Sequence, residues 1–193
     1  GTDVKQDLLI VNGYGIIFSS ANQYMGIGDF ERRAIFMEEV IKKREVPPLP
    51  KGVLIKYGNW EFNSSEDTEI KDLSDTGVKN IVEKIRSGLC QSLYLNPGES
   101  GEIDWGFLQL ECGGSEFIFL QICESYEKKT CWACFDPDYL NSDEEAPIEA
   151  SDGQSVFPLK CTMRDRELAA KCVEWYAHTC EPYPGMDWLK LTW

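Results

Sequence analysis

The most regular alternation of apolar and polar residues lies in the middle of the chain, in residues 105–124. Apolar residues stand two apart in each of two runs, first Leu108, Leu110 and Cys112, then Ile118, Leu120 and Ile122. A period of two is typical of a β-strand with one buried face. Because Gly113 and Gly114 separate the two runs, the pattern predicts a central β-hairpin.

The side-chain pattern also predicts how this hairpin turns. A two-residue loop would place Glu111 opposite Glu116, which brings like charges together. A three-residue loop of residues 113–115 instead pairs Leu110 with Ile118 and keeps the apolar side chains on one face. We therefore predict the three-residue loop, with a glycine at its position of positive φ.

The second face of the hairpin is predicted to be only half polar. It carries three aromatic side chains between its polar ones: Phe107, Phe117 and Phe119. Such a face needs a cover, either a helix of the same chain or a partner. The last helix of the chain, with Trp175 and Tyr176 facing inward, is the predicted cover.

The residues before the hairpin alternate between strand-like and helix-like patterns. Strands are predicted within residues 52–62 and 89–95, and the polar residues 63–72 are predicted to form a loop. A helix is predicted between the loop and the second strand, because apolar residues recur there at helical spacing: Val78, Ile81, Val82 and Ile85.

After the hairpin, strands are predicted at residues 130–135 and 155–160, and a final helix begins at Thr162. One stripe of this helix is apolar: Leu168, Cys172, Trp175, Tyr176 and Thr179. Together these elements predict an α+β domain over residues 51–193, with an antiparallel sheet built on the central hairpin and packed by two or three helices.

The first fifty residues are predicted to form an extension, residues 1–50, that packs on the main domain. It contains a possible hairpin at residues 7–18 and a proline-rich connector at residues 46–50. Between them, a helix starting at Asp29 would point five side chains inward: Phe30, Ile35, Phe36, Val40 and Ile41.

The size and composition of the chain are those of a globular domain. The chain has 193 residues, of which 42% are apolar, so it can bury a core, and it has no apolar run long enough to span a membrane.

The net charge limits the kinds of partner that the chain can bind. Acidic residues outnumber basic ones by 33 to 19, for a net charge of -14. This charge repels phosphate backbones and argues against nucleic-acid binding, whereas a basic protein is its natural complement. The alternative is that the acidity only keeps the protein soluble.

The cysteines indicate a reducing compartment. Most of the eight cysteines are predicted to be free thiols, because several lie on apolar faces of strands and helices, and the protein is predicted to be cytoplasmic. Cys131 and Cys134 have the spacing of a zinc or redox pair, but no second pair accompanies them. No metal is therefore expected, and this pair can be free, metal-bound or disulfide-linked. The first residue is Gly1, so a removed signal peptide stays an open alternative.

The search for catalytic groups argues against an enzyme. His178 is the single histidine, and a histidine near the end of a helix more often stabilises the helix dipole than reacts. No P-loop, nucleophile elbow or zinc-protease motif is present, and no cofactor is expected. A small hydrolase using His178 is the enzymatic alternative, whereas the residue inventory favours a binding protein.

Residues 72–188 resemble a known family in the order of their elements. A helix, a strand, an apolar hairpin and a further strand precede a helix that reads Trp175-Tyr176-Ala177 and leads to Pro182 and Trp188. In this order the chain resembles the immunity proteins of bacterial polymorphic toxin systems, and most of all the family associated with deaminase-type toxins. It departs from the family pattern at Cys180, where such proteins often carry glycine.

The resemblance implies a cytosolic protein that binds a cognate toxin of nuclease or deaminase type and blocks its active site. Such toxins attract phosphates, so their surfaces are basic and complement an acidic inhibitor. The acid-rich residues 136–152, expected to be a loop, are the predicted contact, with Glu66, Asp67 and Glu69 as possible additions. The predicted partner-binding residues are Trp132, Asp136, Asp138, Tyr139, Asp143, Glu144, Glu145 and Glu149. The alternative is a regulatory or scaffold protein that forms a homodimer through its phenylalanine-bearing sheet face.

Overall fold

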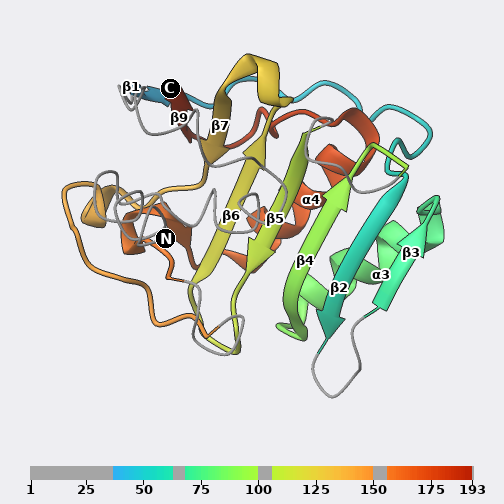
Figure 1. Ribbon diagram of the computed structural model, residues 1–193, viewed down its shortest axis with the longest axis horizontal. Coiled ribbons are helices and arrows are strands. Elements are labelled where there is room, and N and C mark those ends of the chain that lie inside the picture. The colour runs from blue at the N-terminus through green and yellow to red at the C-terminus, as the bar shows by residue number, and fades with distance from the viewer. Residues whose placement is uncertain (1–36, 63–67, 100–105, 150–155, 193) are drawn as a thin grey trace, which may run out of the picture.

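The computed structural model describes residues 37–62, 68–99, 106–149 and 156–192, and nine strands of this part form one antiparallel sheet (Figure 1). Eight strands follow the order β1-β9-β7-β6-β5-β4-β2-β3, and β8 pairs with the beginning of β6. The strands are β1 (Met37–Ile41), β2 (Tyr57–Phe62), β3 (Thr68–Lys71), β4 (Cys90–Asn96), β5 (Phe107–Glu111), β6 (Ile118–Cys123), β7 (Thr130–Ala133), β8 (Thr162–Met163) and β9 (Trp188–Thr192).

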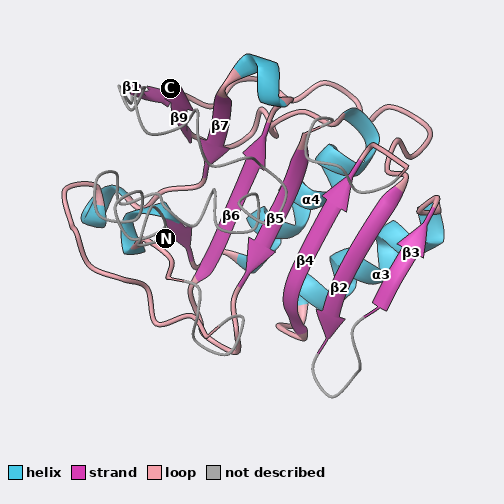
Figure 2. Ribbon diagram, viewed as in Figure 1, coloured by secondary structure: helices cyan, strands magenta, loops and turns pink. Residues whose placement is uncertain are grey.

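Two α-helices of the described residues, α3 (Asp75–Arg86) and α4 (Arg166–Thr179), pack behind one face of this sheet (Figure 2). Each begins at a side-chain cap, since Ser74 accepts a hydrogen bond from the amide of Gly77 and Asp165 accepts one from Leu168. The α+β prediction is confirmed, as is the helix at α3. The last helix begins four residues later than predicted, because Thr162 and Met163 pair with β6 instead.

The core has two parts, one on each face of the sheet. The first lies between the sheet and the helices, where the alternating apolar residues of the hairpin meet the apolar stripe of α3 and the buried side of α4. The second lies on the opposite face and contains Phe107, Phe119, Phe157, Leu189 and Leu191 among others. The predicted division of the hairpin residues between two faces is therefore confirmed.

The predicted register of the hairpin is wrong by two residues. Leu110 lies opposite Leu120 rather than Ile118, so the connection between β5 and β6 is longer than three residues. After Glu111 the chain turns toward β4, where the amides of Cys112 and Gly113 donate hydrogen bonds to the carbonyl of Gln91. These bonds to a third strand lengthen the loop. The alternation of residues within the hairpin cannot predict them, because it contains no information about β4.

The predicted cover of the second face is also wrong. Helix α4 lies on the other face, and the irregular residues 135–149 and 156–161 cover the phenylalanines instead, drawn in yellow to orange at the left of Figure 1. Phe157 packs on Phe119 with ring centroids 4.8 Å apart. The amide of Ala146 donates a 2.7 Å hydrogen bond to the carbonyl of Phe157, which joins the two halves of this cover.

Several predicted elements differ from the structure nearer the ends of the chain. The predicted N-terminal helix is wrong over Met37–Ile41, which form β1, and residues 1–36 lie outside the described residues together with the predicted hairpin. The predicted loop at residues 63–72 contains β3, which pairs with β2. Within the predicted strand at residues 155–160, the described residues form a bridge followed by a 3-10 turn. β9 was not predicted, and like β1 it is a strand because it pairs with a strand distant in sequence.

Residues 42–56 carry the chain from β1 to β2, along one end of the sheet (Figure 1). The proline-rich residues 46–50 are exposed and adopt no regular structure, as expected of a connector. β1 pairs along its whole length with β9, so this part of the predicted extension belongs to the main sheet.

Candidate functional site

The acidic segment, residues 136–149, begins with a local cap. Oδ1 of Asp136 accepts a 3.0 Å hydrogen bond from the amide of Asp138 and opens the 3-10 turn Pro137–Tyr139. Oδ2 of Asp136 lies 3.9 Å from Nη2 of Arg164, which precedes α4. Asp136 is half-buried, and both of its carboxylate oxygens contact groups of its own chain. It therefore stabilises the start of the acidic segment.

Apolar side chains attach the acidic segment to the second face of the sheet. Ala146 and Ile148 are buried there, and Tyr139 and Leu140 are half-buried against the same cluster. The carbonyl of Glu144 also accepts a 2.9 Å hydrogen bond from the amide of Leu159. Tyr139 thus contributes to the fold, which leaves less of its ring for the predicted role of interface anchor.

The acidic segment carries five further carboxylates. All five are exposed, and none forms an ion pair with a cation among the described residues: Asp138, Asp143, Glu144, Glu145 and Glu149. The packed apolar residues between them hold the backbone that carries these charges. The structure thus presents an acidic surface on an ordered segment rather than on a solvated tail.

Trp132 lies apart from this acidic surface. Its neighbours in β7, Cys131 and Ala133, face the second cluster with the acidic segment, so the Trp132 side chain points to the helix side of the sheet. Nζ of Lys190 lies 5.1 Å from the ring centroid, and the buried indole Nε1 has no hydrogen-bond partner in the part of the chain that the structure describes. The structure therefore does not bring Trp132 into one surface with the predicted carboxylates. Glu66 and Asp67 lie outside the described residues.

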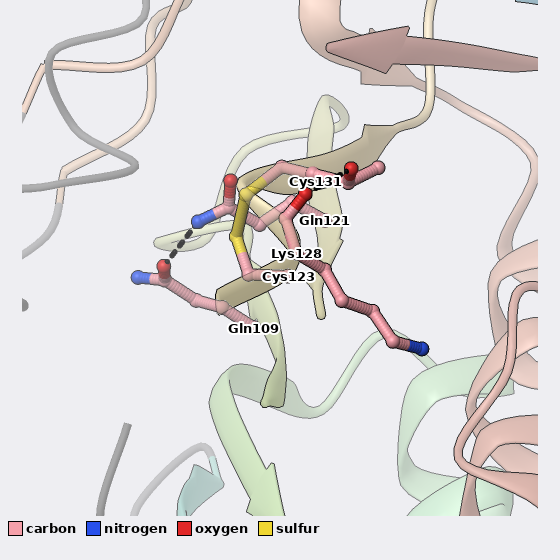
Figure 3. Close-up of a disulfide and its surroundings, with 6 residues drawn as sticks. Gln109, Gln121, Cys123, Lys128 and Cys131 are labelled. Carbon is pink, nitrogen blue, oxygen red and sulfur yellow. Dashed lines mark hydrogen bonds between the residues drawn. A yellow bond between two sulfur atoms is a disulfide. The ribbon is translucent and has the colours of Figure 1, made fainter. Parts of the chain in front are cut away.

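A row of polar side chains crosses the second face beside the phenylalanines. Nε2 of Gln121 donates to Oε1 of Gln109 at 2.9 Å (Figure 3). Nε2 of Gln109 donates in turn to Oε1 of Glu111 at 3.2 Å. Gln121 is fully buried, and its Oε1 has no hydrogen-bond partner among the described residues. These residues were expected on this face, but their burial was not, because the alternation gives no sign of the cover.

Glu111 is the carboxylate most perturbed by this environment. Burial raises its pKa from 4.5 to about 7, the hydrogen bond from Gln109 opposes that shift, and the negative charge of Glu61 adds to it. Glu111 therefore changes charge near neutral pH. The sequence analysis placed Glu111 in the central hairpin, but its alternation gave no sign that the carboxyl would be perturbed.

His178 joins three parts of the fold. It is buried, and its Nδ1 lies 2.8 Å from the carbonyl oxygen of Gly52, so Nδ1 carries the hydrogen and donates. Nε2 lies 3.9 Å from Oδ1 of Asp75 at the start of α3. Nearby, burial raises the pKa of the Cys180 thiol to about 11, which keeps it protonated. Through Nδ1, His178 links α4 to the residues before β2, and through Nε2 it faces the start of α3.

The structure corrects the cysteine prediction at Cys123. This residue was predicted as a thiol, but it forms a disulfide between β6 and β7 with Cys131, whose state the sequence left open (Figure 3). Strand pairing places the two residues opposite each other with Cα atoms 4.1 Å apart, which their eight-residue separation did not reveal. The other six cysteines are free, and Cys134 is buried and bonded to the carbonyl of Cys161 rather than to Cys131. A disulfide is more typical of an oxidising compartment than of the predicted cytosol.

Among the described residues, no group of three or more histidine, cysteine or acidic side chains is placed to hold a metal ion. In the same part of the chain, no helix has the length and apolar character needed to cross a membrane. Comparison with protein-family models, curated proteins and solved structures found no match to this chain. The acidic surface and its electrostatics are therefore the basis for a functional assignment.

Proposed function

We propose that this chain is an immunity protein that binds and neutralises a cognate bacterial toxin of nuclease or deaminase type. The observation that carries the proposal is the acidic surface, whose exposed carboxylates stand on a segment packed against the sheet. The order of elements at residues 72–188, which resembles the deaminase-associated immunity family, supplies the class of partner.

An ordered acidic surface suits rapid binding to a basic protein. Opposite potentials on two proteins speed their encounter and disfavour partners of the wrong charge. Because Tyr139, Ala146 and Ile148 already hold the segment, less conformational entropy is lost when the carboxylates meet cationic side chains. The overall charge of -14 adds a long-range attraction between this chain and a basic partner.

Co-expression tests the proposal directly. The toxin domain encoded beside this protein's gene is expressed in a bacterial host, with and without the full chain, and growth is measured. We expect the wild-type chain to restore growth. If it gives no protection, the proposed function is wrong.

A variant of the acidic surface tests its contribution. The triple substitution Asp143→Asn, Glu144→Gln and Glu145→Gln is expected to weaken toxin binding by about tenfold to a hundredfold at low salt. Isothermal titration calorimetry at low and high salt measures this change. The matched control neutralises three exposed carboxylates outside the segment, Glu45, Glu83 and Glu181, and is expected to bind nearly as well as the wild type.

The two variants separate the surface from the net charge, since each removes the same number of charges. Equal losses in both would show that only net charge matters. An affinity that hardly changes between low and high salt would show that the acidic surface is not the contact.

The homodimer alternative meets a specific obstacle at the surface first considered for it. Phe107 and Phe119 are buried within the chain under the cover of residues 135–149 and 156–161, so a second copy has no access to them. Homodimerisation itself stays a proposal.

A further inference from the structure

The connection between β1 and β2 contains a short segment that is rich in proline. Residues 44–50 read Arg-Glu-Val-Pro-Pro-Leu-Pro and are called the proline segment below. All seven residues are exposed, and none of them belongs to a helix or strand. Two of them carry large apolar side chains, with Val46 38% and Leu49 42% exposed. The proline segment therefore presents apolar side chains where another protein can reach them.

The prolines restrict the backbone of the proline segment to an extended conformation. Each proline fixes its own φ at about −65° and keeps the residue before it out of the helical region. One or both of these restraints apply to every residue from Val46 to Pro50. Among the described residues, the first positive φ after β1 is that of Gly52, at 86°. The expected conformation is therefore polyproline II, a left-handed helix with about three residues per turn.

Bonds to the rest of the chain hold both ends of the proline segment. At its start, the amide of Arg44 donates a 2.8 Å hydrogen bond to the carbonyl of Pro184. Just after its end, the carbonyl oxygen of Gly52 lies 2.8 Å from Nδ1 of His178. Between these points, no backbone group of residues 45–51 forms a hydrogen bond with another described residue. A segment held in this way loses little conformational entropy when it binds a partner.

Polyproline II places residues three apart on the same edge of the helix. Pro47 and Pro50 therefore share one edge and lie about 9 Å apart. Val46 and Leu49 share the neighbouring edge, so each forms an apolar pair with the proline that follows it. Two such pairs, one turn apart, match a groove with two pockets walled by aromatic side chains, which is how SH3-type domains bind proline-rich segments.

Arg44 lies three residues before Pro47, at the same spacing as the two prolines. Its guanidinium forms no ion pair with a described residue. Residues 42–51 contain four bases and one acid, although the chain as a whole has a net charge of -14. The proline segment is therefore locally basic, and its charge complements an acidic pocket at one end of a groove.

We propose that the proline segment binds a protein domain with an SH3-type groove. The two apolar pairs fill the two aromatic-walled pockets, and Arg44 meets the acidic pocket, which fixes the direction in which the proline segment lies. The inference goes beyond the proposed function and does not rest on it, because no residue of the acidic segment takes part.

Titration with an SH3 domain that selects ligands of the pattern Arg-x-x-Pro-x-x-Pro tests the proposal. The full chain is added to the isotope-labelled domain, and saturable changes of NMR chemical shift are expected at the residues of its groove. Pro50→Ala is expected to raise the Kd at least about tenfold, because a pocket loses its occupant. The matched control is Pro48→Ala, which also removes one proline but from another edge of the helix. It is expected to raise the Kd much less.

A second matched pair tests the acidic pocket. Arg44→Glu and Lys51→Glu each reverse the charge of one exposed residue on either side of the prolines. Arg44→Glu is expected to raise the Kd at least about tenfold, and Lys51→Glu much less. Circular dichroism and thermal unfolding of all four variants are expected to match the wild type, since every substituted residue is exposed.

Three results overturn the proposal. The first is a wild-type chain that causes no shift changes in the groove of the SH3 domain. The second is an equal loss of affinity in Pro48→Ala and Pro50→Ala, and the third is an equal loss in the two charge variants.

Discussion

At the scale of single residues, Glu111 shows how the fold changes the chemistry of an ordinary side chain. It ends β5 beside Gln109, and burial raises its pKa to about 7. A carboxyl with a raised pKa binds its proton more tightly in the folded than in the unfolded state. Its contribution to stability is therefore complete below pH 4.5 and is lost as the pH rises through about 7.

Glu111→Gln should remove this pH dependence. The amide keeps the hydrogen bond from Gln109 but never ionises, so the variant is expected to be more stable than wild type at pH 8, by up to about 3 kcal/mol. At pH 4 the difference should be small. Urea denaturation across this pH range measures both proteins, with the exposed Glu116→Gln as the control. Parallel pH profiles for wild type and Glu111→Gln would contradict the assignment.

The disulfide is the second feature that depends on individual residues. Closing a loop between residues eight apart restricts the unfolded chain, so replacing Cys123 and Cys131 by alanine should cost about 2–3 kcal/mol of unfolding free energy. Adding a reductant should lower the stability of the wild type by a similar amount and leave the double variant unchanged. A wild type insensitive to reductant would show that the bond does not form. Cys134 is a buried thiol and serves as the site of a single-substitution control.

At the scale of elements, the irregular cover of the second face is as much a part of the core as the helices are. Phe157 is buried against Phe119, and the amide of Ala146 bonds to its carbonyl. The segment before it was predicted to be a loop too poor in apolar residues to order itself. A few apolar side chains suffice here because the sheet already offers an apolar surface for them.

Phe157→Ala should therefore destabilise the protein by about 3 kcal/mol or more, since it leaves a cavity beside Phe119. It should also reduce the protection from toxin, because the acidic segment loses its support. Thermal unfolding and the co-expression assay measure the two effects. Val156→Ala is the matched control, because the neighbouring Val156 is exposed. Equal stability of the two variants would show that the cover contributes little.

At the scale of the whole molecule, the cover that carries the acidic surface also contacts β1, because Nζ of Lys160 lies 3.6 Å from Oε1 of Glu38. Glu39, the next residue of β1, is exposed and lies outside the acidic segment. Toxin protection by the Glu39→Lys variant is therefore expected to equal that of the wild type in the co-expression assay.

The alternation of residues by itself determined the two faces of the central hairpin, the helix at α3 and the α+β class. These features follow from local periodicity, which survives whatever the rest of the chain does. The charge of the acidic segment was likewise visible in its composition. An acidic surface can be predicted from composition alone, because this prediction does not require knowing which residues lie beside the carboxylates.

The tertiary structure alone decided which element covers each face, the register of the hairpin, the Cys123–Cys131 bond and the separation of Trp132 from the acidic surface. Each depends on pairing between residues distant in sequence. The hairpin loop is set by bonds to β4, and the strand character of Met37–Ile41 by pairing with β9. Such contacts leave no periodic signal in either partner, because their energy arises only when the two segments meet.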